Sequence, residues 1–170
     1  MKLNSDGSCI EGQCGGEGLV RDHNGKFIFA YTVNMGTGTS NNAEAAALLY
    51  GLEWCANKGF GIVLGETGSL LLAKCIKREQ KPPWKISTEV EDIQRVVEVH
   101  GFNISHCFRE ANKPADKLAD LSHSTVGIQT FNSFSELPRH VSGLINLDTW
   151  NMPSFKVKPV KPALFVFNPP

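Results

Sequence analysis

The sequence lacks any excess of charge and any long apolar run. Lysine and arginine together number 17, as do aspartate and glutamate, so the 170-residue chain has a formal net charge of zero. A neutral chain of this kind is not expected to be a strong, sequence-independent binder of nucleic acid. A local basic face that binds nucleic acid is still compatible with the composition. Its apolar runs fall far short of the roughly 18 residues of a membrane-spanning helix, and Met1 is not followed by a basic and then apolar leader. We therefore expect a monomer of the cytoplasm or nucleus that does not enter a membrane.

Metal-binding cysteine spacing is also missing. The five cysteines form an odd set without a Cys-x-x-Cys pair, and no clustered histidine accompanies them. This pattern argues against a zinc site. Cys9 and Cys14 are spaced so that they can face each other across a hairpin, but the simplest expectation is five reduced thiols that pack as small apolar groups.

With 41% hydrophobic residues, the chain can bury one good core, which indicates one main domain. Its first third predicts an antiparallel meander over residues 2–10, 15–22 and 27–34. Asn-Gly at 24–25 favours a tight turn between the last two strands, and the third is rich in β-branched and aromatic residues.

The next part of the chain alternates helices and strands. An apolar stripe predicts a helix to about Asn57, capped at its start by Asn41 or Asn42. The further expected elements are a strand over 61–66, helices over 69–79 and 87–100, a strand over 102–106 and a helix over 113–122. A meander followed by this alternation indicates a mixed sheet covered by helices.

The composition changes towards the C-terminus. Five of the nine prolines fall between residues 153 and 170. We therefore expect a domain over residues 1–123 and a proline-rich C-terminal extension over 124–170, without regular structure after 150.

Three acidic residues stand in separate motifs: Asp6 in Asn-Ser-Asp-Gly-Ser, Glu44 in Ser-Asn-Asn-Ala-Glu-Ala, and Asp116 in Arg-Glu-Ala-Asn-Lys-Pro-Ala-Asp. In this order and spacing the segments resemble the type 1 ribonuclease H (RNase H) fold, and most closely its plant retroelement-derived group. The resemblance covers about residues 1–123. It implies an α/β fold with a mixed five-stranded sheet, three antiparallel strands followed by parallel ones, and helices on both faces.

The resemblance also implies a role for the three carboxylates. In-line cleavage of a phosphodiester needs an activated water and charge neutralisation, which two Mg²⁺ or Mn²⁺ ions about 4 Å apart supply. Asp6, Glu44 and Asp116 are the implied catalytic metal ligands, and we expect them to converge within about 8 Å. Read alone, Asp6 can be a turn residue, and the other two can be helix N-terminal acids favoured by the helix dipole.

One acidic ligand of the pattern is missing. Members of the group usually read Glu-Ser/Thr-Asp-Ser where this chain has Glu-Thr-Gly-Ser, which puts Gly68 at the aspartate position. The loss of this carboxylate predicts impaired catalysis. Glu66 lies two residues earlier, on the same face of a strand, so it is the alternative metal ligand. Its simpler interpretation is a solvated glutamate at the end of a strand.

The resemblance implies substrate contacts as well. An asparagine pair before the helix glutamate touches the minor groove in these families, and amides can recognise ribose 2′-hydroxyls. Asn41 and Asn42 match this pair, although helix capping is an equal alternative. The implied substrate-binding residues are Ser8, Asn41, Asn42, Arg109 and Asn112.

Two further features near the motifs have competing interpretations. A basic stretch can approach the DNA strand of a hybrid or form a solvated helix end. It consists of Lys74, Lys77, Arg78, Lys81 and Lys85, with Trp84. His106 precedes Asp116 by ten residues, the separation of a mobile histidine in bacterial enzymes, but its place at the end of a strand argues against catalysis.

Three functions are consistent with the sequence. We favour a nucleic-acid-binding domain, with RNA–DNA hybrid as its partner, in which Gly68 weakens catalysis. The first alternative is an active Mg²⁺-dependent endoribonuclease that hydrolyses RNA in RNA–DNA hybrids. The second is a protein-interaction module that has kept only the fold.

Overall fold

The computed structural model of the chain describes residues 1–108, 112, 115, 118, 121–122 and 127–149. Its strands are β1 (Lys2–Ile10), β2 (Gln13–Arg21), β3 (Phe27–Thr37), β4 (Leu64–Thr67), β5 (Asn103–His106) and β6 (Ile128–Phe131). Its helices are α1 (Ser40–Asn57), α2 (Leu70–Ile76), α3 (Ser87–His100) and α5 (Arg139–Thr149), with short 3₁₀ turns η1 (Trp84–Ile86) and η3 (Phe134–Glu136). The strands and helices expected before residue 108 are therefore present close to their expected positions.

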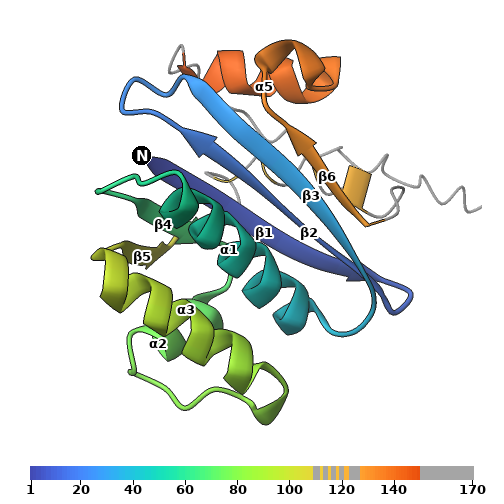
Figure 1. Cartoon of the computed structure of the whole chain (residues 1–170). Coiled ribbons are helices and arrows are strands. Elements are labelled where there is room, and N and C mark those ends of the chain that lie inside the picture. Colours follow the sequence, from blue (N-terminus) through green and yellow to red (C-terminus); the bar gives the residue numbers. More distant parts are fainter. Residues whose placement is uncertain (109–111, 113–114, 116–117, 119–120, 123–126, 150–170) are drawn as a thin grey trace, which may run out of the picture.

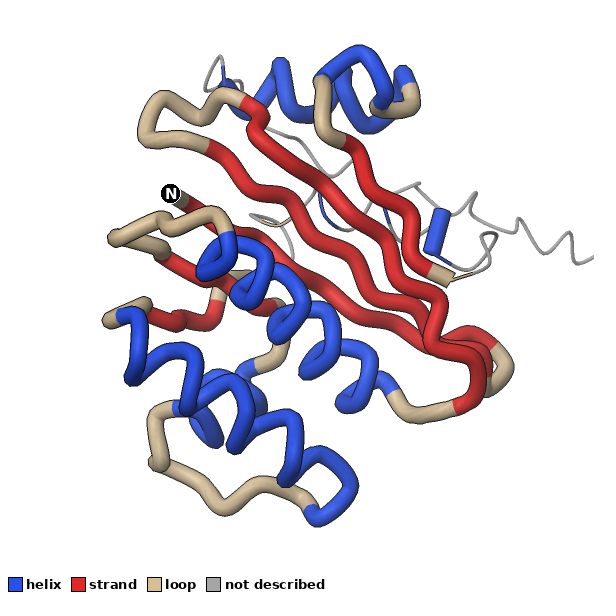
Figure 2. The backbone as a smooth tube through the Cα atoms, in the orientation of Figure 1, coloured by secondary structure: helices blue, strands red, loops and turns tan. Residues whose placement is uncertain are grey.

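The strands form one mixed sheet in the order β5-β4-β1-β2-β3-β6 (Figures 1 and 2). The neighbours β1–β2, β2–β3 and β3–β6 are antiparallel, whereas β1–β4 and β4–β5 are parallel. The expected mixed α/β sheet is thus confirmed. Its expected strand count is wrong by one, because the sheet has six strands and not five.

The additional strand is β6, which pairs with β3 from Val33↔Ile128 to Ala30↔Phe131. Only Phe131 of its four residues is buried, so the sequence offers no alternation from which to predict a strand. By pairing with β3, it covers a strand that would otherwise form the edge of the sheet. Part of the C-terminal segment therefore extends the sheet, whereas residues 150–170 lie outside the described residues.

Helices cover both faces of the sheet, as expected (Figure 1). On one face α1 lies across β1 and β2, and α2 and α3 pack beside it around Leu3, Phe29 and Leu48. On the other face α5 packs through Val141 and Ile145 on a second apolar cluster. No helix in the described ranges combines the length and apolar character that crossing a membrane requires.

Two glycines of β2 set how closely α1 approaches the sheet. A Cβ at Gly18 would clash with the ring of Tyr31, and a Cβ at Gly16 would lie 2.8 Å from Cβ of Ala47. The Tyr31 hydroxyl in turn donates a hydrogen bond to the Ala47 carbonyl oxygen of α1 at 2.6 Å. The glycine-rich composition of β2 is therefore a packing requirement of α1 and the Tyr31 ring.

The start of α1 differs from the expectation. Thr39 is the N-cap, and its hydroxyl oxygen accepts a hydrogen bond from the backbone N–H of Asn42 at 3.4 Å. The prediction that Asn41 or Asn42 caps the helix is therefore wrong, because the helix begins earlier, at Ser40. A threonine is a good N-cap for the same physical reason as an asparagine.

The cysteines also differ in part from the expectation. Cys9 and Cys14 face each other across the β1–β2 hairpin and form a disulfide, with 4.1 Å between their Cα atoms. The prediction of five reduced thiols is wrong for this pair. Cys55, Cys75 and Cys107 are free and buried, as expected.

Substituting Gly18 with alanine tests the close packing of the sheet on α1. We expect the free energy of unfolding to fall by about 2 kcal/mol, because the added methyl group overpacks the contact with Tyr31. Denaturant unfolding measures the change. The matched control is Gly143→Ala on α5, where an added Cβ meets nothing within 4 Å and stability should stay level or rise. Equal unfolding midpoints for Gly18→Ala and the unmodified protein would contradict this account.

Candidate metal centre

Asp6 lies in the middle of β1 and is buried, with 3% of its surface exposed. Its Oδ1 atom accepts a hydrogen bond from the backbone N–H of Gly7 at 3.0 Å. An ionised carboxylate buried to this degree is costly unless it is paired, hydrogen-bonded or bound to a cation. Asp6 is therefore the natural centre of the site.

Glu44 comes to Asp6 because α1 begins directly over β1. A Cβ at Gly7 would collide with the backbone of Ala43 and Glu44, so only glycine allows the first turn of α1 to lie this close. A glycine beside an aspartate could instead leave room for a phosphate backbone to approach. In the structure the first turn of α1 fills the space beside Gly7, so this glycine allows the two elements that carry the carboxylates to pack together.

Thr67 at the end of β4 orients Glu44, a role that the sequence did not reveal. Its hydroxyl donates a hydrogen bond to Oε2 of Glu44 at 3.1 Å and accepts one from the backbone N–H of Ser69 at 3.2 Å. Thr67 is fully buried. The only signal in the sequence was its place in the Glu-Thr-Gly-Ser segment beside Gly68.

Position 68 faces both carboxylates. A Cβ built on Gly68 would lie 3.1 Å from Oδ1 of Asp6 and 3.7 Å from Oε1 of Glu44. The two carboxylates therefore converge on the point from which a side chain at position 68 would extend. The backbone of Gly68 is not in the left-handed region, so a side chain there needs only a small shift of Asp6.

Glu66 is engaged elsewhere. Its Oε2 atom accepts a hydrogen bond from Nδ2 of Asn4 at 2.8 Å, and its Oε1 atom pairs with Nζ of Lys2 at 3.1 Å. Asn4 in turn accepts a hydrogen bond from the Arg21 guanidinium at 2.9 Å. Lys2 and Asn4 precede Asp6 on β1, so these contacts hold the Glu66 carboxylate towards the start of that strand, away from position 68.

The substrate-binding candidates before residue 108 differ in their surroundings. Asn42 is occupied, because its Oδ1 accepts from the Thr39 hydroxyl at 2.6 Å and its Nδ2 donates to the Lys85 carbonyl oxygen at 2.9 Å. Asn41 is exposed beside it. Ser8 is half-buried, two residues after Asp6 on β1. Of the asparagine pair, Asn41 is therefore the one available to a ligand.

The third expected ligand, Asp116, and the candidate Arg109 both lie outside the described residues. Asn112 is described and fully buried. Its Nδ2 donates a hydrogen bond to the Ser5 carbonyl oxygen at 3.0 Å, next to Asp6 in β1. The backbone carbonyl oxygen of Asn112 accepts a hydrogen bond from the backbone N–H of Ala115 at 3.1 Å. This geometry makes Asn112 an anchor that ties its segment to the sheet beside Asp6.

The oxygen ligands of this site are of the type that a hard cation prefers, but the described residues supply too few of them. Asp6 and Glu44 offer carboxylate oxygens, which suit Mg²⁺ or Mn²⁺. Within the ranges described above, no group of three or more histidine, cysteine, aspartate or glutamate side chains is placed to hold a metal ion. Two converging carboxylates and the open position at Gly68 are what the described part of the chain provides.

The fold is that of the RNase H class. The similar solved structures include RNase H1 of the archaeon Halobacterium salinarum, with a TM-score of 0.67 and 21% identity over 71% of this chain and 95% of that one. LC11-RNase H1, crystallised with an RNA/DNA hybrid, has a TM-score of 0.67 and 20% identity over 72% and 96% of the two chains. The foamy viral protease-reverse transcriptase with an RNA/DNA hybrid has a TM-score of 0.65 and 22% identity, over 74% of this chain and 20% of that one.

The chain belongs to the reverse transcriptase-like family, whose model matches residues 4–122. A candidate ribonuclease H protein of Arabidopsis thaliana is 29% identical over 159 residues, which cover 88% of this chain and 24% of that protein. The chain thus spans about a quarter of the length of this curated relative.

Buried thiols near the site give a prediction on pH. Burial raises the pKa of Cys107 to about 11, with the negative charges of Glu66, Asp6 and Glu44 adding to the effect, and burial raises the pKa of Cys55 to about 12. The ordinary value is 9.0, so the native protein holds these protons more tightly than the unfolded chain. We expect the free energy of unfolding to fall as the pH rises above 9. Mass spectrometry should show that the native thiols resist alkylation by iodoacetamide at pH 9.

The same reaction in denaturant provides the comparison. Unfolded thiols ionise near their ordinary pKa, so they should be alkylated rapidly under identical conditions. Native Cys107 and Cys55 that react as fast as the unfolded chain would contradict the protection inferred from the structure.

Proposed function

We propose that this domain binds nucleic acid, with RNA–DNA hybrid as the preferred ligand, at the Asp6–Glu44 site and cleaves it slowly at best. The observation that carries the proposal is the position of Gly68. A Cβ built at position 68 points at both carboxylates, so the aspartate that this chain lacks would have belonged to the site itself. The frame around the site is otherwise kept, because Gly7, Thr67 and Asn112 all hold elements in place around it.

Asp6 and Glu44, with Asp116, would hold Mg²⁺ or Mn²⁺. When bound, such ions neutralise charge on the phosphate and activate the attacking water. Thr67 fixes one oxygen of Glu44 and leaves the other, Oε1, directed towards position 68. The chain therefore presents one oxygen of Asp6 and one of Glu44 to a cation at this point.

The glycine at position 68 removes one negative charge and one inner ligand from such a site. Losing a group that stabilises charge in the transition state typically costs about a hundredfold or more in rate. Glu66 is not positioned to compensate, since Asn4 and Lys2 hold its carboxylate. These contacts support the proposal of slow cleavage.

Several features support nucleic acid as the ligand. Asn41 is exposed at the start of α1, and Asn42 ties α1 to the turn η1 that carries Trp84 and Lys85. The structures of the neighbours LC11-RNase H1 and the foamy viral enzyme were both determined in complex with RNA/DNA hybrids. Family membership and the Arabidopsis relative support a plant retroelement origin.

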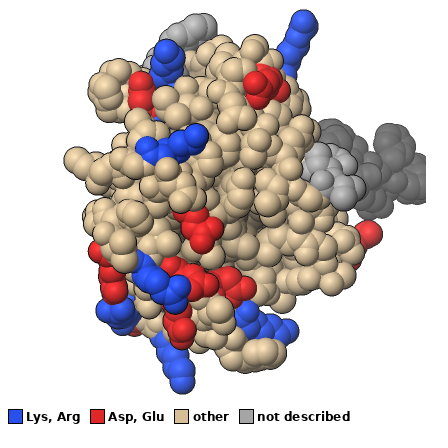
Figure 3. Space-filling model, in the orientation of Figure 1, with Lys and Arg blue, Asp and Glu red and all other residues tan. Residues whose placement is uncertain are grey.

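We expect the binding to be weak. In the face shown in Figure 3, acidic and basic side chains alternate over the lower part, where α2 and α3 lie in Figure 1. In the same region Arg78 is paired with Glu98 at 2.6 Å. With a net charge of zero, few counterions are released on binding, so affinities in the micromolar range are the expectation.

An active endoribonuclease is the second candidate. The observation that favours it is the retained convergence of Asp6 and Glu44, together with the Thr67 hydroxyl that orients one of them. Cleavage of a labelled hybrid by the unmodified protein, in Mg²⁺ and Mn²⁺ with a chelator control, separates the candidates. A domain that neither binds nor cleaves hybrid would instead be an interaction module.

Restoring the carboxylate is the sharpest test of the site. In Gly68→Asp we expect Mg²⁺-dependent cleavage of an RNA–DNA hybrid to rise by about a hundredfold or more, because a side chain at this position reaches between Asp6 and Glu44. Single-turnover cleavage assays give the rate. Gly68→Asn is the matched control, since it adds nearly the same volume without charge, and it should leave the rate near that of the unmodified protein.

Glu66→Ala distinguishes the remaining outcomes of this assay. If the unmodified protein cleaves rapidly and Glu66→Ala abolishes the activity, Glu66 is the replacing ligand. If rapid cleavage survives Glu66→Ala, Asp6, Glu44 and Asp116 suffice, and the proposal of impaired catalysis is wrong. No gain in Gly68→Asp over Gly68→Asn would equally overturn it.

The two asparagines give a matched pair of variants. We expect Asn41→Ala to reduce the preference for hybrid over DNA duplex, because its exposed amide can recognise 2′-hydroxyls. Asn42→Ala should instead lower stability by about 1 kcal/mol, because it removes the hydrogen bonds to Thr39 and Lys85. Binding titrations and denaturant unfolding of both variants measure the two effects. A reversal of the two roles would remove Asn41 from the binding site.

A further inference from the structure

Phe108, just beyond β5, presents an aromatic ring to solvent. The residue is 74% exposed. The ring of His106 packs against it edge-to-face, with 5.2 Å between centroids and 79° between planes. The contact supports the phenyl ring from one side and leaves most of it accessible, as in a platform for a flat ligand.

This ring lies beside the carboxylate site. The backbone N–H of Cys107 donates to the Thr67 carbonyl oxygen at 3.0 Å, and the Thr67 hydroxyl in turn holds Glu44. His106 is paired with Thr67 in the parallel β4–β5 ladder. Adjacent strands lie about 5 Å apart, and Phe108 comes two residues after His106, the partner of Thr67 in this ladder.

A second apolar side chain is exposed just after the end of β4. Leu70, at the start of α2, is 51% exposed and follows Gly68 by two residues. A single exposed apolar side chain is ordinary, but here Phe108 and Leu70 flank the end of β4 at which position 68 faces Asp6 and Glu44. A chain of nucleotides whose phosphate approaches these carboxylates would bring its next base to this surface.

We propose that Phe108 stacks on an unpaired base next to the phosphate held at the Asp6–Glu44 site. Within a duplex both faces of a base are covered by neighbours, so away from the duplex end an unpaired nucleotide is the one that offers a free face to an aromatic ring. The preferred ligand is then a hybrid with a single-stranded extension. This inference rests on the proposed nucleic-acid-binding function and specifies the form of its ligand.

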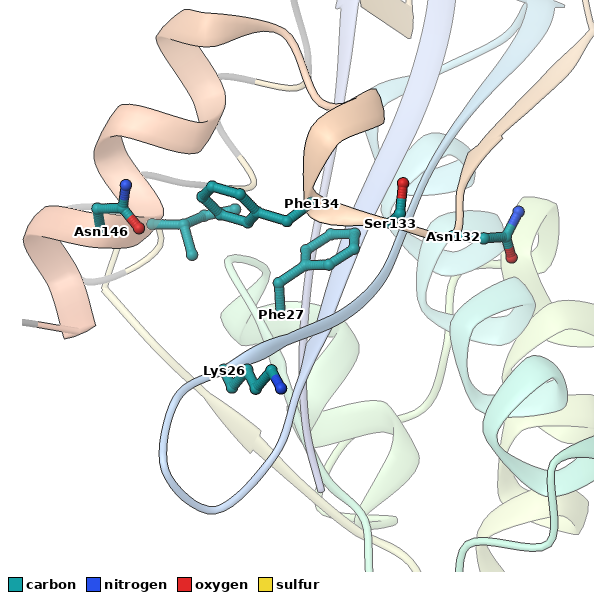
Figure 4. A pocket seen from close by; sticks show the side chains of 7 residues that line it. Lys26, Phe27, Asn132, Ser133, Phe134 and Asn146 are labelled. Carbon is teal, nitrogen blue, oxygen red and sulfur yellow. The ribbon is translucent and has the colours of Figure 1, made fainter.

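Other aromatic groups in the described ranges do not offer the same surface at the site. Phe27 and Phe134 face each other in a pocket of about 360 Å³ between β3, η3 and α5 (Figure 4). Phe27 begins β3, two strands away from β1 in the sheet, and lies five residues before Thr32, the β3 residue level with Asp6. Trp84 is exposed on η1, but the Lys85 ammonium lies 5.5 Å over its ring. Phe108, by contrast, packs on the ring of His106, the residue paired with Thr67.

The test compares a blunt RNA–DNA hybrid with the same hybrid carrying a short single-stranded RNA extension. Fluorescence anisotropy at low salt, with Ca²⁺ in place of Mg²⁺ so that a hard cation can join the carboxylates to the phosphate, measures the affinity of the full chain for both. We expect the extended hybrid to bind about tenfold more tightly, in the range of one stacked base. Phe108→Ala should abolish this preference and leave blunt binding unchanged, and Phe108→Trp should retain it.

Two controls separate stacking from other effects. Val99→Ala removes a side chain of similar exposure, 72%, from the far end of α3 and should change neither affinity. Stacking releases no counterions, so Phe108→Ala should keep the salt dependence of the unmodified protein, whereas Lys85→Ala should reduce the slope by about one charge. A reduced slope in Phe108→Ala would overturn the stacking inference.

The outcomes distinguish this inference from the function on which it rests. Equal binding of blunt and extended hybrids by the unmodified protein would overturn the stacking inference and leave nucleic-acid binding intact. A preference for the extension that survives Phe108→Ala would also overturn it. Absence of binding to both ligands would overturn the proposed function, and the inference with it.

Discussion

The close contact between the first turn of α1 and Gly7 of β1 is the constraint on which the site depends. It brings Glu44, which belongs to a helix, next to Asp6, which belongs to a strand. The contact continues along the helix, because Ala47 packs on Gly16 and Gly51 packs on Leu3. Since interiors are packed as closely as crystals, a methyl group at position 7 would lift the helix and separate the two carboxylates.

The polar groups around this contact form two separate sets. One set is the Asp6–Glu44 pair with the Thr67 hydroxyl. The other is the chain from Arg21 through Asn4 to Glu66 and Lys2. Because the second set neutralises Glu66 by itself, the loss of a carboxylate at position 68 lowers the negative charge of the first set without disturbing the frame. This separation agrees with the proposed function, in which the architecture of the site is kept while its catalysis is weakened.

The part of the sequence with strong hydrophobic patterning predicted its structure well. The meander, the long helix to Asn57 and the helix from Ser87 were all readable, because their apolar residues recur with the period of a strand or helix. The failures fall where patterning is weak or where partners are distant in the sequence. β6 has one buried residue, and the disulfide of Cys9 and Cys14 depends on hairpin register. Asp116 and Arg109 stay predictions.

The sequence by itself determined the class of fold, the order of its elements and the identity of the acidic residues in their motifs. It also showed that position 68 carries no carboxylate. Only the tertiary structure decided that position 68 faces both Asp6 and Glu44, that Glu66 is held by Lys2 and Asn4, and that Asn42 is occupied while Asn41 is exposed. The reason is physical: periodicity reports which face of an element is buried, whereas the direction of a polar side chain depends on hydrogen-bond partners that folding brings from other strands and helices.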